Sequence, residues 1–290
     1  MSSSSRRDFL RGGAFAALGL ALPFKGKSSL IESFAASKKL NAFGLQLWTV
    51  KEDMARDAKD TLKKVASYGY KQIESFEGKS GMFWGMSNKD FKKYLDGLGT
   101  RIISSHCNIS TDFEKKAAEA AEIGMKYLIC PYKGPQKSID QFKKFADEFN
   151  KAGEICKKNG LRFAYHNHDY SFKPVEGQLP QEVMMNNTDK DLVDFEMDIY
   201  WVVAAGESPE AWFKKHPNRF RLCHVKDYAK TANGHESVQL GKGTIDFHSI
   251  LKVGTANGLR NYIVEQEAFT GSNPLDSAAA DAKYMKAFAI

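Results

Sequence analysis

The stretch RFAYHNHDYSF, residues 162–172, begins with apolar residues and continues with side chains that can bind metal or move protons. His166 and His168 are separated by one residue, so in a β-strand both imidazoles would lie on the same face. A single histidine at a strand end is more often a hydrogen-bonded residue of the core or rim than a metal ligand. Taken alone, the stretch is compatible with a metal site or with an ordinary polar loop.

Similar polar residues end several other apolar runs of the chain. They are Glu74, His106, Glu196, Asp198, His224, Lys226, Glu265 and Glu267. Strand alternation places Glu196 with Asp198, and Glu265 with Glu267, on common faces. So many carboxylates and imidazoles would be costly to bury together, and a divalent cation would compensate their charge. Mixed histidine and carboxylate ligands predict one ion of Mn²⁺, Co²⁺, Fe²⁺ or Zn²⁺.

Eight short apolar or β-branched runs carry these residues. They span residues 43–50, 70–76, 101–107, 125–132, 161–168, 193–202, 220–227 and 261–269. Amphipathic segments such as FEKKAAEAAEIG, which end in glycine, lie between them and predict helices. Strand and helix repeat at intervals of roughly 30 residues, which predicts consecutive βαβ units. We therefore predict one (β/α)₈ TIM barrel domain over residues 36–290, with the active site at the carboxyl ends of its strands.

Five motifs in order, AYHNHDY, FEMDIYWV, CHVKD, GKGTIDF and YIVEQE, resemble the sugar phosphate isomerase/epimerase family. These xylose isomerase-like TIM barrels also include inosose dehydratases and ketose 3-epimerases. The resemblance covers essentially everything from about residue 40 onward. It implies a divalent metal held by a Glu, an Asp, a His and a second Glu from strands five to eight. Carried over by position, the Asp is Asp198, the His is His224 and the last Glu is Glu265.

The first ligand departs from the pattern of the epimerases. Where they have a glutamate, the chain has His166, which we expect as the fourth ligand, with His168 as the alternative ligand or a substrate contact. The epimerases use two metal-bound glutamates as acid and base, so another group must move the proton here, or the reaction differs. Our candidate acid/base groups are, in order, Glu267, Lys226, Glu74 and His106. Our candidate sugar-stacking residues are Trp48, Trp84 and Tyr200, for which ordinary packing at the rim is an equal alternative.

The chemistry implied by the resemblance narrows the function. Our first hypothesis is a metal-dependent isomerase or epimerase that acts through an enediolate on an unphosphorylated sugar or keto-sugar. The second is a lyase, dehydratase or hydrolase that acts on keto-sugars or 3-keto-glycosides by elimination. A non-catalytic carbohydrate-binding barrel ranks below both, together with an endonuclease of the related DNA-repair branch. A homo-oligomer is compatible with the sequence.

Charge argues against a nucleic-acid partner. The formal net charge is +7, but residues 1–35 hold five basic residues against two acidic ones, so +4 remains for the barrel. That value is ordinary for a soluble surface, and no basic run with interleaved aromatic residues occurs in the sequence. We therefore expect no nucleic acid as a partner.

Residues 1–35 are typical of a targeting segment. Arg6-Arg7 is followed by Phe9, Leu10 and about a dozen apolar residues, which resembles a twin-arginine export signal. Small residues near Ala35 offer a cleavage site. We expect contact with the twin-arginine (Tat) export machinery during secretion, and then a soluble periplasmic or otherwise exported protein without stable membrane association. The four cysteines lie in apolar runs and are predicted to be buried free thiols.

Overall fold

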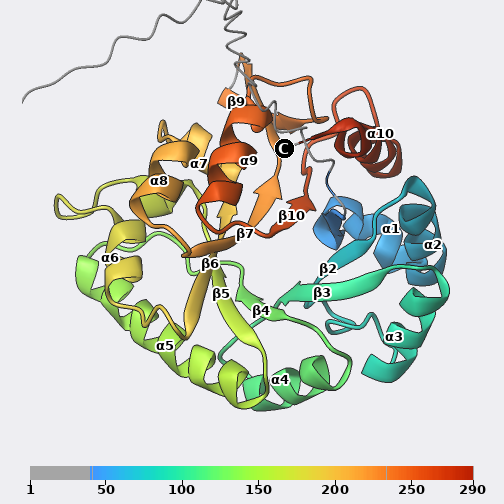
Figure 1. Cartoon of the computed structure of the whole chain (residues 1–290), viewed down its shortest axis with the longest axis horizontal. Coiled ribbons are helices and arrows are strands. Elements are labelled where there is room, and N and C mark those ends of the chain that lie inside the picture. The colour runs from blue at the N-terminus through green and yellow to red at the C-terminus, as the bar shows by residue number, and fades with distance from the viewer. Residues whose placement is uncertain (1–39, 41, 233, 290) are drawn as a thin grey trace, which may run out of the picture. The chain divides into compact units, whose positions relative to one another are not determined.

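The computed structural model describes residue 40, residues 42–232 and residues 234–289. Eight of the described strands form a closed parallel barrel in the order β1-β10-β7-β6-β5-β4-β3-β2 (Figure 1). They are β1 (Gly44–Gln46), β2 (Gln72–Phe76), β3 (Arg101–His106), β4 (Tyr127–Cys130), β5 (Arg162–His166), β6 (Val193–Asp198), β7 (Phe220–Val225) and β10 (Asn261–Val264). This arrangement confirms the predicted (β/α)₈ barrel. The predicted domain division near residue 35 lies outside the described residues.

Helices surround the barrel (Figure 1). They are α1 (Lys51–Arg56), α2 (Ala58–Tyr68), α3 (Asn88–Gly97), α4 (Phe113–Glu122), α5 (Ile139–Lys158), α6 (Pro180–Asn186), α7 (Ile199–Ala204), α8 (Pro209–Lys215), α9 (Phe247–Ala256) and α10 (Pro274–Ala287). Two 3₁₀ turns, η1 (Leu47–Val50) and η2 (Asp169–Phe172), follow β1 and β5. The long helix α5 shows why these segments fold this way, because Phe142, Phe149 and Cys156 recur at helical spacing and are all buried.

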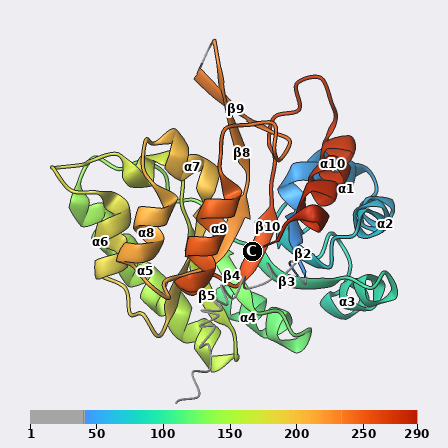
Figure 2. The same cartoon turned by 45° about the horizontal axis from the view of Figure 1, so that its top comes forward.

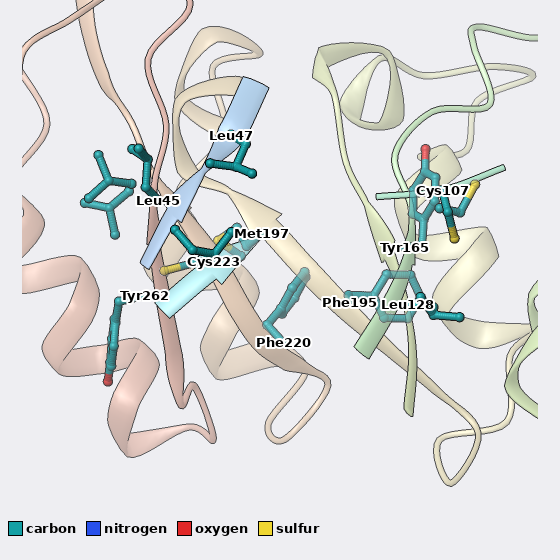
Figure 3. Packing of buried hydrophobic residues seen from close by; sticks show 14 of the residues in the cluster. Leu45, Leu47, Cys107, Leu128, Tyr165, Phe195, Met197, Phe220, Cys223 and Tyr262 are labelled. Atoms are coloured by element: carbon teal, nitrogen blue, oxygen red, sulfur yellow. The ribbon is translucent and has the colours of Figure 1, made fainter. Parts of the chain in front are cut away.

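Apolar side chains that alternate along the strands pack in the layer between barrel and helices (Figure 3). Tyr165, Phe195 and Cys223 belong to this main cluster, whereas a separate small cluster of Tyr127, Ile129, Ala164 and Leu222 comes from the alternate strand positions. Because successive side chains point to opposite faces, the small cluster lies inside the barrel. The polar residues that share its alternation, such as His166 and His224, therefore also point inward.

Two predicted strands end earlier than the sequence suggested. The run 43–50 becomes β1 and the turn η1, and the run 193–202 becomes β6 and helix α7. Side chains at the junctions cap the new elements, because Gln46 accepts a hydrogen bond from the Trp48 amide and Asp198 accepts one from the Trp201 amide. The chain therefore turns at Asp198, which fixes that carboxylate at the mouth of the barrel.

A two-stranded antiparallel hairpin, β8 (Asp227–Thr231) and β9 (Gly234–Val238), follows β7 and projects from one end of the barrel (Figure 2). The sequence reasoning did not predict it. The Asp227 carboxylate accepts hydrogen bonds from the backbone amides of Gly241, Gly243 and Ile245, so it ties the loop after the hairpin to the end of β7. A Cβ at Gly243 would lie 2.2 Å from the Asp227 carboxylate, so the residue at this position must be glycine.

Cys107, Cys130, Cys156 and Cys223 are free and buried, which confirms the predicted thiols. Within the described part of the chain, no helix combines the length and the apolar character that crossing a bilayer requires.

Candidate metal centre

Three residues from neighbouring strands meet at the mouth of the barrel. Asp198, His224 and Glu265 each offer a ligand atom, and these atoms all lie within 4.8 Å of one another. The Nδ1 atom of His224 lies 3.1 Å from Glu265 Oε2 and 3.8 Å from Asp198 Oδ2. All three residues are buried. The structure therefore brings together the three residues that the family resemblance implied as metal ligands.

A second group lies next to the first and shares His224. It consists of His106, His166, Glu196 and His224, whose ligand atoms also lie within 4.8 Å of one another. The Oε2 atom of Glu196 lies 2.8 Å from His106 Nε2 and 3.0 Å from His166 Nδ1. The other ring nitrogen of His166, Nε2, lies 3.8 Å from Asp198 Oδ2, so this imidazole faces both groups.

Glu74 lies behind His224, on the side away from Asp198. Its Oε1 atom accepts a hydrogen bond from Gln46 Nε2 and lies 2.7 Å from His224 Nε2, and its Oε2 atom accepts one from the Ser104 hydroxyl. The side chain has no solvent exposure. These contacts fix the ring of His224 so that its other nitrogen, Nδ1, faces Asp198 and Glu265.

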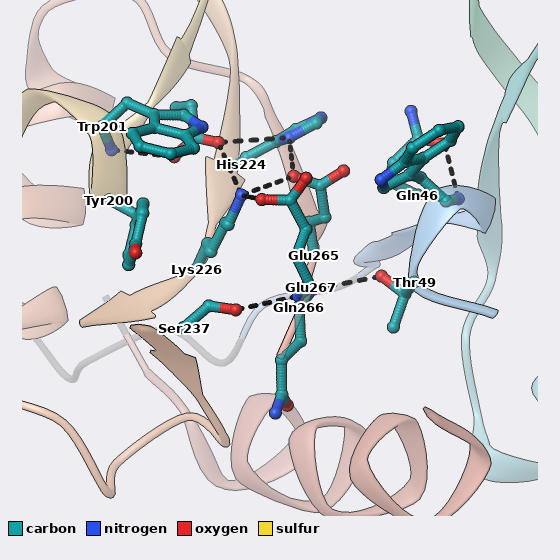
Figure 4. Close-up of polar contacts among 12 residues, drawn as sticks. Gln46, Thr49, Tyr200, Trp201, His224, Lys226, Ser237, Glu265, Gln266 and Glu267 are labelled. Carbon is teal, nitrogen blue, oxygen red and sulfur yellow. Dashed lines mark hydrogen bonds and ion pairs between the residues drawn. The ribbon is translucent and has the colours of Figure 1, made fainter. Parts of the chain in front are cut away.

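The ammonium of Lys226 is the cation of the site (Figure 4). It donates to Asp198 Oδ2 at 3.4 Å and to Glu265 Oε2 at 3.1 Å, and it is ion-paired with Glu267. It also lies over the rings of Tyr200 and Trp201, at 5.0 and 5.2 Å from their centroids. The side chain of Lys226 is 1% exposed, whereas that of Glu267 is 34% exposed. Glu267 is therefore the member of the pair that solvent and ligands can reach.

Burial and charge distribute protons unevenly over the histidines of the site. Burial lowers the pKa of His166 well below its usual value, and the neighbouring His224 adds to the effect. For His224, burial also acts to lower the pKa, but Glu196 and Glu265 outweigh it and raise the pKa well above 6.5. For His106, Glu74 and Glu196 likewise outweigh burial and raise the pKa to about 9. His166 is therefore neutral, and its free ring nitrogen suits metal coordination.

The carboxylates of the site divide in the same way. Burial raises the pKa of Glu196 to about 7 and that of Asp198 to about 6, with Lys226 opposing the shift of Asp198. For Glu265, burial acts upward, but Lys226 and His224 outweigh it and lower the pKa far below 4.5. For Lys226, burial acts downward, but Asp198, Glu265 and Glu267 outweigh it and raise the pKa above 10.5. Lys226 is thus held as an ammonium at every ordinary pH.

The donor set fits a divalent cation. Five carboxylates converge on one region, and they belong to Glu74, Glu196, Asp198, Glu265 and Glu267. Among the described residues of this region, Lys226 is the one permanently charged cation. The Oε1 atom of Glu196 is buried and lacks a hydrogen-bond partner among the described residues. An uncompensated buried carboxylate oxygen is costly, and coordination to a cation would remove that cost.

A cavity of about 780 Å³ opens over these groups. Six of the predicted residues line it, namely Trp48, His106, His166, His168, Glu265 and Glu267, whereas Asp198, His224 and Lys226 lie beneath the lining. Burial lowers the pKa of His168 to about 4, and its buried Nδ1 atom lacks a hydrogen-bond partner among the described residues.

The three predicted sugar-stacking residues lie in different environments in the structure, and only Trp48 lines the cavity. Trp48 lines the cavity and is 39% exposed. Trp84 lies behind it, where its indole N–H donates to Ser75 and its ring packs edge-on against Phe76. Tyr200 is buried, and its hydroxyl lies 2.6 Å from His235 Nδ1 of the hairpin.

Sequence reasoning missed several residues of the site. Tyr132 and Trp201 line the cavity, and Glu196 joins the inner group of ligands. Glu196 carried a signal, because it shares a strand face with Asp198. Tyr132 carried none beyond its place at the end of the run 125–132.

A family model described as "Xylose isomerase-like TIM barrel" matches residues 62–288, and the chain belongs to this family. The chain is similar to a sugar phosphate isomerase/epimerase from Parabacteroides distasonis, with 30% sequence identity and a TM-score of 0.74. The similarity covers 90% of this chain and 97% of that protein. Over 51% of its length it is 30% identical to an inosose dehydratase from Clostridium perfringens. The chain spans 54% of that relative, or about half its length.

An IOLI protein crystallised with a zinc atom has the same fold. It shares 16% identity with this chain and a TM-score of 0.67, with 83% of this chain and 95% of that protein covered. The relatives are thus named as enzymes of sugar isomerisation or of dehydration, and this structural neighbour holds a zinc atom.

Proposed function

We propose that this protein is a metal-dependent enzyme that removes a proton next to the carbonyl of an unphosphorylated sugar or keto-sugar, forming an enediolate. One observation carries the proposal: the ligand atoms of Asp198, His224 and Glu265 lie within 4.8 Å of one another beside the Lys226–Glu267 ion pair, and Glu265 and Glu267 line the cavity. Ligands for a cation, a carboxylate base and a buried ammonium group are therefore adjacent, and the base faces the cavity.

The metal would be held by Asp198, His224 and Glu265, with His166 as the fourth ligand. The Nε2 atom of His166 lies 3.8 Å from Asp198 Oδ2, and its low pKa leaves the ring neutral. Mixed imidazole and carboxylate ligands suit Mn²⁺, Co²⁺, Fe²⁺ or Zn²⁺. When bound, such an ion polarises a carbonyl and stabilises the negative charge of an enediolate.

Glu267 is our general base. It lines the cavity, it is partly exposed, and it is ion-paired with Lys226. Lys226 is a poor base because its pKa is raised. Its buried ammonium does not line the cavity, so we assign it to holding the carboxylates of Glu265 and Glu267 in place. His106 lines the cavity and is our general acid. Glu74 lies outside the lining, and we assign it to positioning His224.

Two fates of the enediolate remain. Return of the proton to another carbon or to the other face gives isomerisation or epimerisation, as the name of the Parabacteroides distasonis protein suggests. Loss of a β-oxygen gives dehydration or cleavage of a 3-keto-glycoside. The second outcome is favoured by His166, since an imidazole replaces the first of the two metal-bound glutamates of the epimerases, and by the similarity to an inosose dehydratase. A non-catalytic carbohydrate-binding barrel is the third alternative.

The charges of the cavity support an unphosphorylated substrate. Lys133 is the only lysine or arginine among the described residues that line it, and it is ion-paired with Glu148. A phosphate group would need cationic or backbone donors directed at it.

Product analysis by NMR in heavy water tests the proposal. Metal-loaded protein is incubated with a panel of sugars, keto-sugars and 3-keto-glycosides, with the Asp198→Ala variant as a metal-deficient control. Deuterium incorporation without loss of mass indicates isomerisation or epimerisation, and loss of water or of an aglycone indicates elimination. If no substrate exchanges a proton or changes mass, the enzyme proposal fails and the binding barrel is supported.

We also propose that the protein is exported through the twin-arginine route to the periplasm and that residues before about Ala35 are removed. The support is the Arg6-Arg7 motif and the apolar run in the sequence, which lie outside the described residues. Intact-mass measurement of protein from the periplasmic fraction tests this. A full-length mass there, or recovery from the cytoplasm alone, would contradict it.

A further inference from the structure

We infer that the substrate carries a second ring, a neutral aglycone with an apolar face, which binds against Tyr132 at the end of the cavity away from Lys226. This inference rests on the proposed function, because it names the substrate class of the same site. A free monosaccharide would leave that end of the cavity empty.

The first argument is size. A hexose has twelve non-hydrogen atoms, and at roughly 20 Å³ per atom, below the ~30 Å³ that a water molecule takes in the liquid, it fills about 240 Å³. The cavity has about 780 Å³, so one sugar ring occupies roughly a third of it. The remaining space accommodates a second ring and its ordered water.

The second argument is exposure. Among the described residues, Trp48 and Tyr132 are the two large hydrophobic side chains that are exposed, at 39% and 55%, and both line this cavity. They follow β1 and β4, which are three positions apart in the barrel, so they contribute to different walls. Exposed aromatic rings gathered in one concave site are typical of ring recognition, and scattered surface packing would not place both there.

The third argument is the rigid support of Tyr132. Its ring packs edge-on against His168 and Tyr170, with centroid distances of 5.0 and 5.3 Å. His168 in turn lies 5.1 Å from His166. Tyr132 is therefore two ring contacts away from the proposed metal ligands, and a group stacked on it would belong to the second ring of the substrate and not to the reacting one.

The fourth argument is charge at this end of the cavity. Lys133 is ion-paired with Glu148, and the Glu77 carboxylate accepts hydrogen bonds from the Lys116 ammonium and the Asn108 amide. Apart from Glu265 and Glu267, the charged residues of the lining are thus already compensated. Ile109 and Pro131 add apolar surface to the lining that Tyr132 shares. A neutral group, either a second pyranose or an aryl ring, fits this surface, and a charged one does not.

Binding measurements on unreactive glycosides test the inference. Methyl, phenyl and cellobiose-type β-glucosides are titrated against wild-type protein, Tyr132→Ala and Tyr132→Phe. Burial of about 50 Å² of ring face at ~25 cal/mol per Å² corresponds to about tenfold in affinity. We expect the phenyl glucoside or the disaccharide to bind about tenfold tighter than the methyl glucoside, Tyr132→Ala to abolish the preference, and Tyr132→Phe to keep it. The ligand with the larger preference identifies the second ring as aryl or sugar.

Equal affinities for the three ligands, no measurable binding, or a preference that survives in Tyr132→Ala would overturn the inference. Turnover of the corresponding 3-keto compounds separates it from the proposed function. A Tyr132-dependent preference in binding without any turnover leaves the inference standing while the proposed function fails. Turnover of all three compounds with equal kcat/KM supports the proposed function and overturns the inference. Because Tyr132 is more than half exposed, its replacement by alanine leaves the fold intact.

Discussion

Replacing Glu74 with glutamine tests whether this buried carboxylate positions a metal ligand or takes part in proton transfer. The carboxylate lies 2.7 Å from His224 Nε2 and accepts hydrogen bonds from Gln46 and Ser104. Glutamine has nearly the same shape, and its carbonyl oxygen can still accept from Gln46 and His224. Its amide nitrogen can donate to the Ser104 hydroxyl. The substitution therefore removes the negative charge behind His224, which also lies 3.3 Å from His106 Nε2 and raises the pKa of that imidazole.

The magnitude follows from that single change. A hydrogen bond to a charged group contributes about 1.5–3 kcal/mol and one between neutral groups about 1, so the loss is about 1–2 kcal/mol. This corresponds to a metal affinity weaker by about tenfold, within the range seen when partners behind a ligating histidine are removed. The Glu74→Gln variant should remain folded and recover most of its activity at saturating metal.

Competition with a chromogenic chelator measures the metal affinity, and circular dichroism checks the fold. Ser104→Ala is the matched control, because it removes one hydrogen bond to the same carboxylate but keeps its charge and its contact with His224. We expect that control to weaken metal binding by less than about threefold. Two results would refute the positioning role: an unchanged metal affinity in Glu74→Gln, or activity that stays lost at saturating metal and so shows that the carboxylate acts in proton transfer, either directly or through His106.

Three further predictions concern the ligands and one buried acid. Asp198→Ala should lose bound metal and activity while the barrel stays folded, and an unchanged stoichiometric ion by metal analysis would show that the site lies elsewhere. His166→Ala should weaken metal binding by at least about tenfold, whereas His168→Ala should mainly raise KM; normal metal binding and turnover in both variants would leave the two histidines as ordinary polar residues. Burial raises the pKa of Asp281 to about 7, while the Leu240 amide that donates to this carboxylate opposes the shift. The folded state therefore binds the proton more tightly than the unfolded state, and ionisation costs stability increasingly from about pH 4 to pH 7. Asp281→Asn should remove this cost. In urea unfolding, the free energy of unfolding of the variant should exceed that of the wild type by an amount that grows between pH 5 and pH 7 towards at most about 4 kcal/mol. A difference between the two proteins that does not vary with pH would contradict the argument.

The strands and their polar ends were predictable because both depend on local patterns. Each barrel strand falls within a run that the sequence marked, and the inward face of His166 and of Asp198 follows from strand alternation. The end of β6 was not predictable, since the apolar residues continue without a break into α7. An apolar run does not show where a strand gives way to a helix, and the cap formed by the Asp198 side chain decides it here.

The hairpin after β7 was missed although its sequence contains a turn signal. Asn-Gly at 233–234 is typical of a two-residue hairpin turn, but the flanking residues DYAKT and HESV are mostly polar and lack the apolar alternation of a strand. The pairing is held from outside the hairpin as well. The Ser237 hydroxyl accepts hydrogen bonds from the amides of Glu267 and Ala268, and His235 contacts Tyr200. Such tertiary contacts leave no local pattern in the sequence.

The alternation of side chains along a strand does not show how deep in the barrel each residue of the site lies. Glu196 and Asp198 share a face of β6, and the two-residue period of a strand predicts only that both point into the barrel. In the structure Glu196 lies one layer further inside, against His106 and His166, whereas Asp198 faces Lys226 and His224 at the mouth. The layer to which each belongs depends on the stagger between β3, β5, β6 and β7, which is set by pairings such as His166 with Glu196 and Asp198 with His224. Because the two nitrogens of His166 face both layers, this one imidazole links the inner carboxylate to the proposed metal ligands. The assignment of His166 as a ligand therefore depends on barrel stagger, which only the closed barrel defines.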